Sequence, residues 1–176
     1  MDLSQNHIQA LIASTPATPE NQLLLAALES LHYDAGFDNQ DYIYSNILAV
    51  PGRASALPFG TTSAPVITQI GADHHFLWIA STGFANTANA AMIVALLAYP
   101  NISMQIYNQS TGKQLFDAPM PCVDMVGNGE QVYYLKLPLL LPPTTKLAVT
   151  YTNFDAAVSY NVYLAFHGYK IFDLNS

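Results

Sequence analysis

Charge is what this sequence has least of. Only 10% of its 176 residues are charged, against roughly 25% in an average soluble domain. Because charge keeps a monomer soluble, this low content predicts that much of the surface is covered by copies of the chain or by a partner. Only five residues are Lys or Arg, and the formal net charge is −7. We therefore expect no binding to nucleic acid, which requires clustered cations.

Cysteine is nearly absent as well. Cys122 is the single one, which excludes an internal disulfide and a disulfide-stapled secreted scaffold. Cys122 lies between Pro121 and Val123, and we expect its side chain to pack as a small hydrophobic group and not to act as a reactive thiol. The first residues, MDLSQNHIQ, lack the basic and apolar segments of a secretory signal. The longest apolar run, 90–99, is about half the length of a membrane helix, so no membrane partner is expected.

Recognisable catalytic motifs are missing too. Asp73-His74-His75 is the one dense cluster of metal-capable side chains, but consecutive strand residues point to opposite faces, so we predict a surface turn and no metal. His167 has no Ser or Cys motif around it, and we predict a structural role. The sequence thus predicts no enzyme, no catalytic residue and no cofactor.

The first 35 residues have a helical pattern. Thr18 is placed as an N-cap, Pro19 as the first helical residue and Glu20 in the first turn, with Gly36 as a stop. Two apolar stripes follow the helical period: Leu3, Ile8, Leu11 and Ile12, then Leu23, Leu24, Ala27, Leu28 and Leu31. Such short helices are not stable alone, so we expect them to dock on something. Residues 37–64 are rich in turn formers, and we interpret them as an extended arm running over another surface.

From Pro65 onward the pattern changes to β. Leu147, Val149 and Tyr151 alternate with smaller or polar residues, as does the run from Val158 to Phe166, which is typical of antiparallel strands with one buried face. Further strands are predicted at 66–70, 76–81 (ended by Gly83), 91–98, 102–106 and 132–137. About eight regularly spaced strands indicate a mainly β chain with a single jelly roll or β-sandwich. The predicted domains are an N-terminal helical and extended arm (1–58), the jelly roll (59–172) and a C-terminal tail (173–176).

Several phrases in this order carry a family resemblance: PVITQIGADHHFLWIASTGFANT, MQIYNQSTGKQLFDAPMP, LPLLLPPTTKLAVTYTN and the terminal YNVYLAFHGYKIF. Over residues 59–172 the chain resembles small jelly-roll structural proteins of tailed bacteriophage virions, of the kind that act as capsid cement or decoration proteins or sit at head and tail joints.

The resemblance implies a non-enzymatic capsid cement or decoration protein that stabilises the lattice of the major capsid protein. It would be made in the bacterial host cytoplasm and reside on the capsid surface of the virion. Its partners would be the major capsid protein and itself, as a dimer or trimer. For attachment we expect apolar residues of the helices and the arm: Leu3, Ile8, Leu11, Leu24, Leu28, Leu31, Tyr42 and Tyr44.

Two other functions remain open. The many tyrosines could stack on sugar rings, which would suit a carbohydrate- or receptor-binding module of a phage tail, fibre or head–tail joint. Asp117, Asp124 and Glu130 could meet in space as the carboxylates of a hydrolase.

Overall fold

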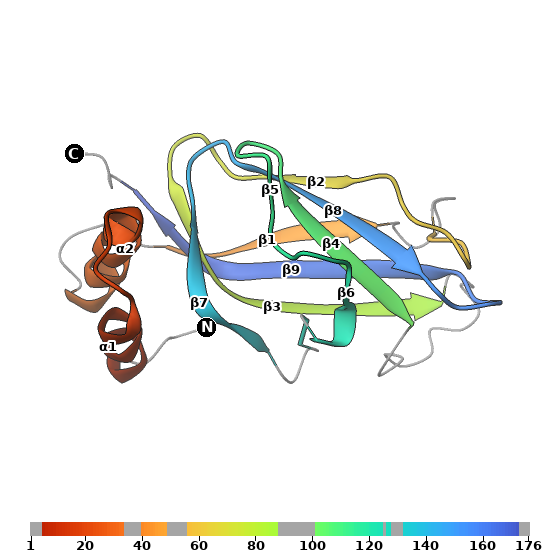
Figure 1. Ribbon diagram of the computed structural model, residues 1–176, viewed down its shortest axis with the longest axis horizontal. Coiled ribbons are helices and arrows are strands. Elements are labelled where there is room, and N and C mark those ends of the chain that lie inside the picture. Colours follow the sequence, from red (N-terminus) through yellow and green to blue (C-terminus); the bar gives the residue numbers. More distant parts are fainter. Residues whose placement is uncertain are drawn as a thin grey trace.

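The computed structural model describes residues 5–33, 40–48, 56–87, 101–124, 126–127 and 132–172. Two helices come first and strands follow (Figure 1). In chain order the elements are α1 (Gln5–Ser14), a 3₁₀ turn (Pro19–Asn21), α2 (Gln22–Tyr33), β1 (Gln40–Leu48), β2 (Val66–Gln69), β3 (His75–Thr87), β4 (Ile102–Asn108), β5 (Lys113–Gln114), β6 (Met120–Pro121), a second 3₁₀ turn (Cys122–Asp124), β7 (Tyr133–Leu141), β8 (Lys146–Asn153) and β9 (Tyr160–Ile171).

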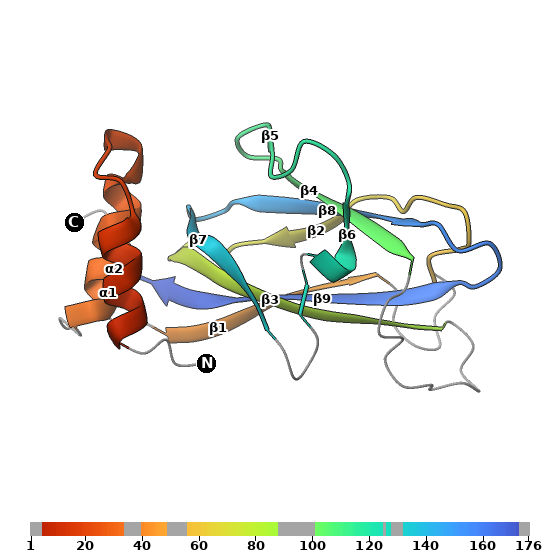
Figure 2. The ribbon, with the colours of Figure 1, turned by 60° about the horizontal axis from the view of Figure 1, so that its bottom comes forward.

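The strands form two antiparallel sheets that pack face to face. Sheet A has the order β1-β9-β3-β7, and sheet B has the order β2-β8-β4-β5, with β6 also paired to β4. From β1 to β4, and again from β7 to β9, successive strands alternate between the sheets, so the connections cross the end of the sandwich each time. This is the connectivity of a jelly roll, and it confirms the predicted fold (Figure 2).

The main core lies between the two sheets. On β9 the alternate residues Tyr160, Val162, Leu164 and Phe166 are buried, as the sequence pattern predicted. Leu147, Val149 and Tyr151 of β8 face them from sheet B. The Trp78 ring lies edge-on to Phe166, with 4.8 Å between the ring centroids. Aromatic pairs in this geometry add stability beyond the area that they bury.

Both helices dock on the outer face of sheet A, at the end where β9 stops and β3 starts (Figures 1 and 2). The predicted start of the second helix is confirmed, since Pro19 opens a 3₁₀ turn that continues into α2, although the Thr18 side chain makes no capping hydrogen bond. A second core joins the helices to the sheet: Leu11, Leu24, Ala27 and Leu28 pack with Leu77, Ile79, Ala80, Tyr169 and Ile171.

Two predictions need correction. Residues 40–48 are not an arm, because β1 pairs with β9 without interruption and belongs to the jelly roll, so the predicted boundary after residue 58 lies too late. Nor does Gly83 end its strand, since β3 continues to Thr87. A Cβ at Gly83 would lie 2.5 Å from the Tyr163 carbonyl oxygen, so the glycine marks close strand contact. The strand predicted at 91–98 and the stop at Gly36 lie outside the described residues.

Leucine-to-alanine substitutions in α2 test how the helices are held. Leu28 is fully buried, whereas Leu23, on the same helix, is 48% exposed. We expect Leu28→Ala to lower the free energy of unfolding by about 2–4 kcal/mol, because it leaves a cavity in the second core. Leu23→Ala is the matched control and should cost less than about 0.5 kcal/mol. Urea titration followed by circular dichroism measures both, and equal effects would contradict the docking.

Candidate binding surface

The apolar residues predicted to attach the chain to a partner are mostly used inside the protein. Leu31 is half-buried, and Leu3 lies outside the described residues. The other four helical residues are at most 9% exposed: Ile8, Leu11, Leu24 and Leu28. Leu11, Leu24 and Leu28 belong to the core between the helices and sheet A, and Ile8 is buried as well, so these side chains offer little surface to another protein.

Tyr42 and Tyr44, the two predicted attachment residues on β1, point to the inner side of sheet A. Their rings meet edge to face at 4.8 Å. The Lys170 ammonium lies 3.6 Å from the centroid of the Tyr42 ring, a favourable cation–π contact. Tyr44 packs edge-on against Phe76. Only the Tyr42 ring reaches solvent to an appreciable degree, so Tyr44 contributes to packing.

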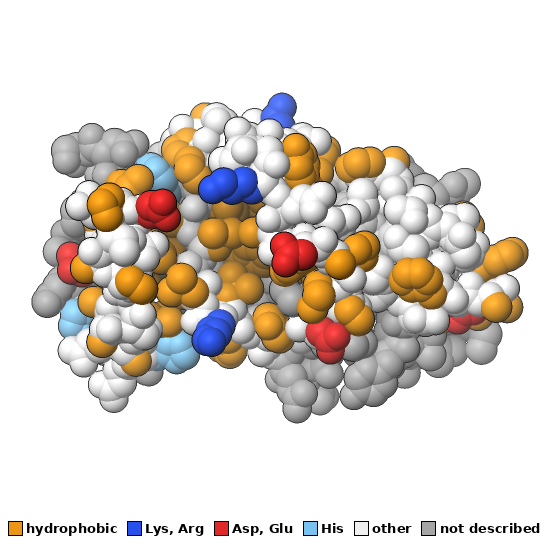
Figure 3. All heavy atoms as spheres, viewed as in Figure 1, with side chains coloured by type: hydrophobic (Ala, Val, Ile, Leu, Met, Phe, Trp, Pro, Cys, Tyr) orange, Lys and Arg blue, Asp and Glu red, His pale blue; other side chains and the backbone are white. Residues whose placement is uncertain are grey.

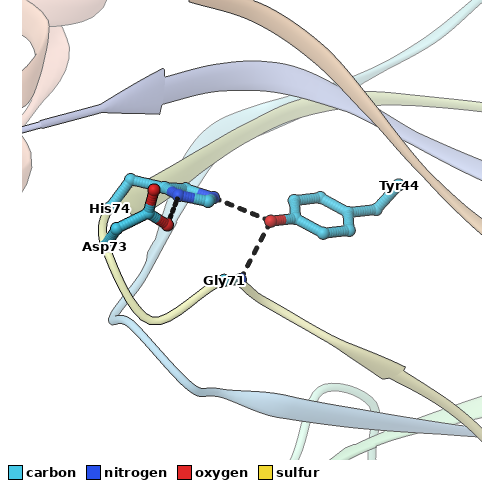
Figure 4. Close-up of polar contacts among 4 residues, drawn as sticks. All are labelled: Tyr44, Gly71, Asp73 and His74. Carbon is cyan, nitrogen blue, oxygen red and sulfur yellow. Dashed lines mark hydrogen bonds and ion pairs between the residues drawn. The ribbon is translucent and has the colours of Figure 1, made fainter.

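Tyr44 also ends a chain of hydrogen bonds (Figure 4). Its hydroxyl accepts from the Gly71 N–H at 3.0 Å and lies 2.7 Å from His74 Nε2, while His74 Nδ1 lies 2.6 Å from Asp73 Oδ1. Burial is the main cause that raises the pKa of Tyr44, so its hydroxyl stays protonated at neutral pH and is no nucleophile. The chain of bonds therefore secures the β2–β3 turn to β1.

The prediction that Asp73-His74-His75 forms a surface turn needs correction. Asp73 is exposed, but His74 and His75 are both buried. The hydrogen bond from His74 is the main cause that lowers the pKa of Asp73. No group of three or more His, Cys, Asp or Glu residues able to hold a metal ion occurs in the described part of the chain.

Among the described residues, the other chemically capable side chains lie in separate surroundings. Burial raises the pKa of the Cys122 thiol to about 12, so little reactive thiolate exists at neutral pH. His167 Nε2 lies 2.6 Å from the Thr82 hydroxyl on the neighbouring strand. Asp117 and Asp124 are exposed, and Glu130 lies outside the described residues, so the hydrolase hypothesis stays untested. Across the described ranges no helix is long and apolar enough to cross a membrane.

Two loops with many internal hydrogen bonds lie at the end of the sandwich opposite the helices (Figure 1). We call the loops 57–63 and 153–160 the distal tip. The first loop is fastened on both sides: Leu57 and Tyr160 exchange two backbone hydrogen bonds, and Ser63 N–H donates to the Tyr151 carbonyl. Because Tyr160 begins β9 and Tyr151 belongs to β8, this loop joins the two sheets.

Asn153 is the hub of the distal tip. It is fully buried, and its Nδ2 donates to the carbonyls of Leu57, Pro58 and Val158 at 3.3, 3.3 and 2.8 Å. Its Oδ1 accepts from the Asp155 N–H at 2.9 Å. One amide side chain thus provides hydrogen-bond partners for backbone groups of both loops. Burying these backbone groups without partners would cost free energy.

Asp155 orders the second loop in the same way. Its carboxylate accepts hydrogen bonds from the N–H groups of Ala157 and Val158 and from the Tyr160 hydroxyl. The backbone bond from Ala157 is the main cause that lowers the pKa of Asp155, so the loop is fully bonded only while this carboxylate is ionised.

Two aromatic rings are held out into water by this bonded framework. Phe59 is 53% exposed and Phe154 is 58% exposed, and hydrophobic side chains are visible at this end in Figure 3. Gly60 has φ +63° and lets the chain reverse directly after Phe59. The Phe154 N–H donates to the Asn101 carbonyl, which fixes the backbone beneath its ring. A rigid pair of exposed aromatics can bind an apolar or partly apolar surface with little loss of conformational entropy.

The sequence interpretation missed both phenylalanines. The available signal was their setting, because each large aromatic lies among turn-forming residues, in Pro58-Phe59-Gly60 and in Asn153-Phe154-Asp155. Core aromatics instead lie in alternating or helical patterns.

Substituting the hub tests the order of the tip. Asn153→Ala removes the donor for three carbonyls, and we expect it to lower the free energy of unfolding by about 2–3 kcal/mol. Amide hydrogen exchange in residues 57–63 should rise as well. Asn108→Ala is the control, since its Oδ1 accepts only from the exposed turn N–H groups of Ser110 and Thr111, and it should change stability by less than about 1 kcal/mol. Unchanged exchange in the Asn153 variant would refute the hub.

Acid should destabilise the protein in two steps. Burial lowers the pKa of His75 and His167 below the ordinary 6.5, so their neutral forms favour the fold above pH 6.5, and this stability is lost as the pH falls toward their folded-state pKa values. The lowered pKa of Asp155 adds stability above its ordinary 3.8 that is lost below that pH. We expect Tm to fall between pH 7 and 5, and again below pH 3.8. His167→Gln should flatten the first step, and a Tm that is constant from pH 7 to 5 would contradict this account.

The distal tip is thus an exposed apolar surface whose two loops are held by hydrogen bonds. Comparisons of the chain with protein-family models, with curated proteins and with solved structures find no match.

Proposed function

We propose that the chain is a non-enzymatic structural protein of a tailed-phage virion, a capsid cement or decoration protein that binds the lattice of the major capsid protein through its distal tip. The observation that carries the binding role is the exposed pair Phe59 and Phe154 on loops fixed by Asn153 and Asp155. The virion assignment rests on the family resemblance of residues 59–172, and the jelly-roll connectivity is consistent with it.

The energetic argument concerns the rigidity of the tip. A flexible loop loses conformational entropy when it binds, at a cost of about 1–2 kcal/mol for each backbone residue that is fixed. In this protein the hydrogen bonds of both loops have already ordered the chain before a partner arrives. Little of the free energy gained by burying the two rings is then offset by the entropy cost of ordering the loops. Aromatic anchors on rigid supports are typical of interface hot spots.

The composition favours the same role. A cement protein makes many identical contacts on a repeating shell, so a modest affinity at each contact is multiplied over the particle. The scarcity of charge suits surfaces that remain covered, because permanent interfaces are more apolar than transient ones. Burial raises the pKa of Cys122 and of Tyr44, so neither side chain is an activated nucleophile at neutral pH.

Shell binding of tip variants tests the proposal. Shells of the same phage prepared without this chain would be mixed with the purified protein, and bound protein would be measured after sedimentation. The double variant Phe59→Ala/Phe154→Ala should bind at least about thirtyfold more weakly, as expected when two hot-spot rings are lost. Ile67→Ala is the control, since Ile67 is 45% exposed on β2, outside the two tip loops, and it should bind like the wild type.

Thermal melts of both variants establish that each is folded before binding is compared. Equal binding of the double variant and the wild type would refute attachment through the tip. A wild-type chain that fails to bind shells at all would refute the cement function.

The same rings favour one alternative, a carbohydrate- or receptor-binding module of a tail, fibre or head–tail joint. Exposed aromatics can stack on the apolar faces of sugars. This alternative predicts that the wild type is retained on immobilised host-surface glycans and that the double variant is not. Retention on glycans without shell binding would favour the alternative over the cement function.

A further inference from the structure

Strand β1 forms one edge of sheet A, and this edge has few of the features that normally prevent strand pairing. It is nine residues long, contains neither Pro nor Lys, and keeps an unbroken register with β9 from Gln40 to Leu48. The opposite edge, β7, contains Lys136 and Pro138, and its partner strand has a register shift. The outer strands of sheet B, β2 and β5, have only four and two residues. Among the described edges, β1 is therefore the long and unprotected one.

Every second residue of β1 turns its backbone groups away from β9. Opposite residues in an antiparallel pair alternate between bonded and non-bonded positions. The Thr68 hydroxyl of β2 donates to the Ser45 carbonyl at 3.3 Å and occupies one of its two acceptor positions, which indicates that this carbonyl points away from β9. By alternation, the backbone groups of Ile43 and Ile47 also point outward. Within the described ranges no strand pairs with β1 on that side.

The same residues place apolar side chains on the outer face of sheet A. Ile43 is 56% exposed and Ile47 is 42% exposed. Ile47 is opposite Tyr163, whose ring stacks on Phe84 at a centroid distance of 4.3 Å, so a row of apolar side chains crosses β1, β9 and β3. The helices cover only the other end of this face, where Tyr169 and Ile171 lie.

The size of this apolar patch indicates how it can be covered. Ile43, Ile47 and Phe84 together expose on the order of 200–300 Å². A stable protein–protein interface buries about 800 Å² on each partner, so contact between these side chains alone is too small. Continuous backbone pairing along nine residues adds both area and directional hydrogen bonds. The edge and the patch must therefore act together.

We propose that two copies of the chain pair their β1 strands antiparallel about a twofold axis, so that sheet A continues across the dimer. A second copy fits because the contact is self-complementary: with the axis at Ser45, Ile43 of each copy lies opposite Ile47 of the other. The apolar rows of the two copies then form one strip.

The oligomeric state of the full chain tests the pairing, without reference to any shell. Sedimentation equilibrium of the wild type should give a dimer. Ile43→Lys places a charge at the edge and in the patch, and it should raise the dissociation constant of the dimer at least about tenfold. Ile67→Lys is the matched control, because Ile67 is similarly exposed on the short edge strand β2, and it should remain dimeric.

A second variant tests the pairing without weakening the contact between the two copies. Ser45→Cys would place two thiols across the axis, and mild oxidation should convert most of the folded protein into a disulfide-linked dimer. Phe84→Cys, on β3 of the same face, should cross-link far less. A wild-type monomer at high concentration, a trimer, or an Ile43→Lys variant that dimerises like the wild type would each overturn the proposal. The tip variant Phe59→Ala/Phe154→Ala should still dimerise, so failure of the shell-binding function and failure of this pairing are distinguishable.

Discussion

The fold depends on one close approach between β9 and β3 at Gly168. A Cβ there would lie 2.0 Å from the Leu77 carbonyl oxygen, so a residue with a side chain does not fit. Beside it the pairing of β3 shifts by one residue between Trp78 and Ala80, which is a β-bulge. The Trp78 indole N–H spans this bulge and donates to the Ala80 carbonyl at 2.9 Å.

Strand β9 contributes to two cores because successive side chains of a strand alternate between its two faces. Tyr160, Val162, Leu164 and Phe166 face sheet B, whereas Tyr169 and Ile171 pack against the helices. The helices therefore pack against the jelly roll, and most of the leucine side chains in their apolar stripes are buried in this contact. The surfaces left for partners are elsewhere: the distal tip, with its bonded loops, and the open β1 edge. We propose that these two surfaces mediate association, whereas the acid-sensitive groups His75, His167 and Asp155 stabilise the fold.

Local patterns in the sequence were enough to predict much of the secondary structure and the fold class. The alternation in β8 and β9 and the Thr18-Pro19 start of the second helix are visible without any tertiary information. Pro138 made β7 look shorter than it is, because proline disfavours interior strands, yet it is tolerated here on an edge. Turn formers around β1 similarly hid its alternation. The distal tip could not have been predicted by such patterns, because Asn153 bonds to carbonyls about 95 residues away in the chain.

The central claim is that the chain is a structural component of a virion shell. The measurement that tests it most directly is the number of copies of the chain per purified particle, obtained by quantitative mass spectrometry against the major capsid protein. The account predicts copies in the hundreds, in a fixed ratio to the capsid protein, as lattice symmetry requires. Absence of the chain from purified particles would contradict the claim, and a dozen copies or fewer would place it at the neck or tail and contradict the cement role.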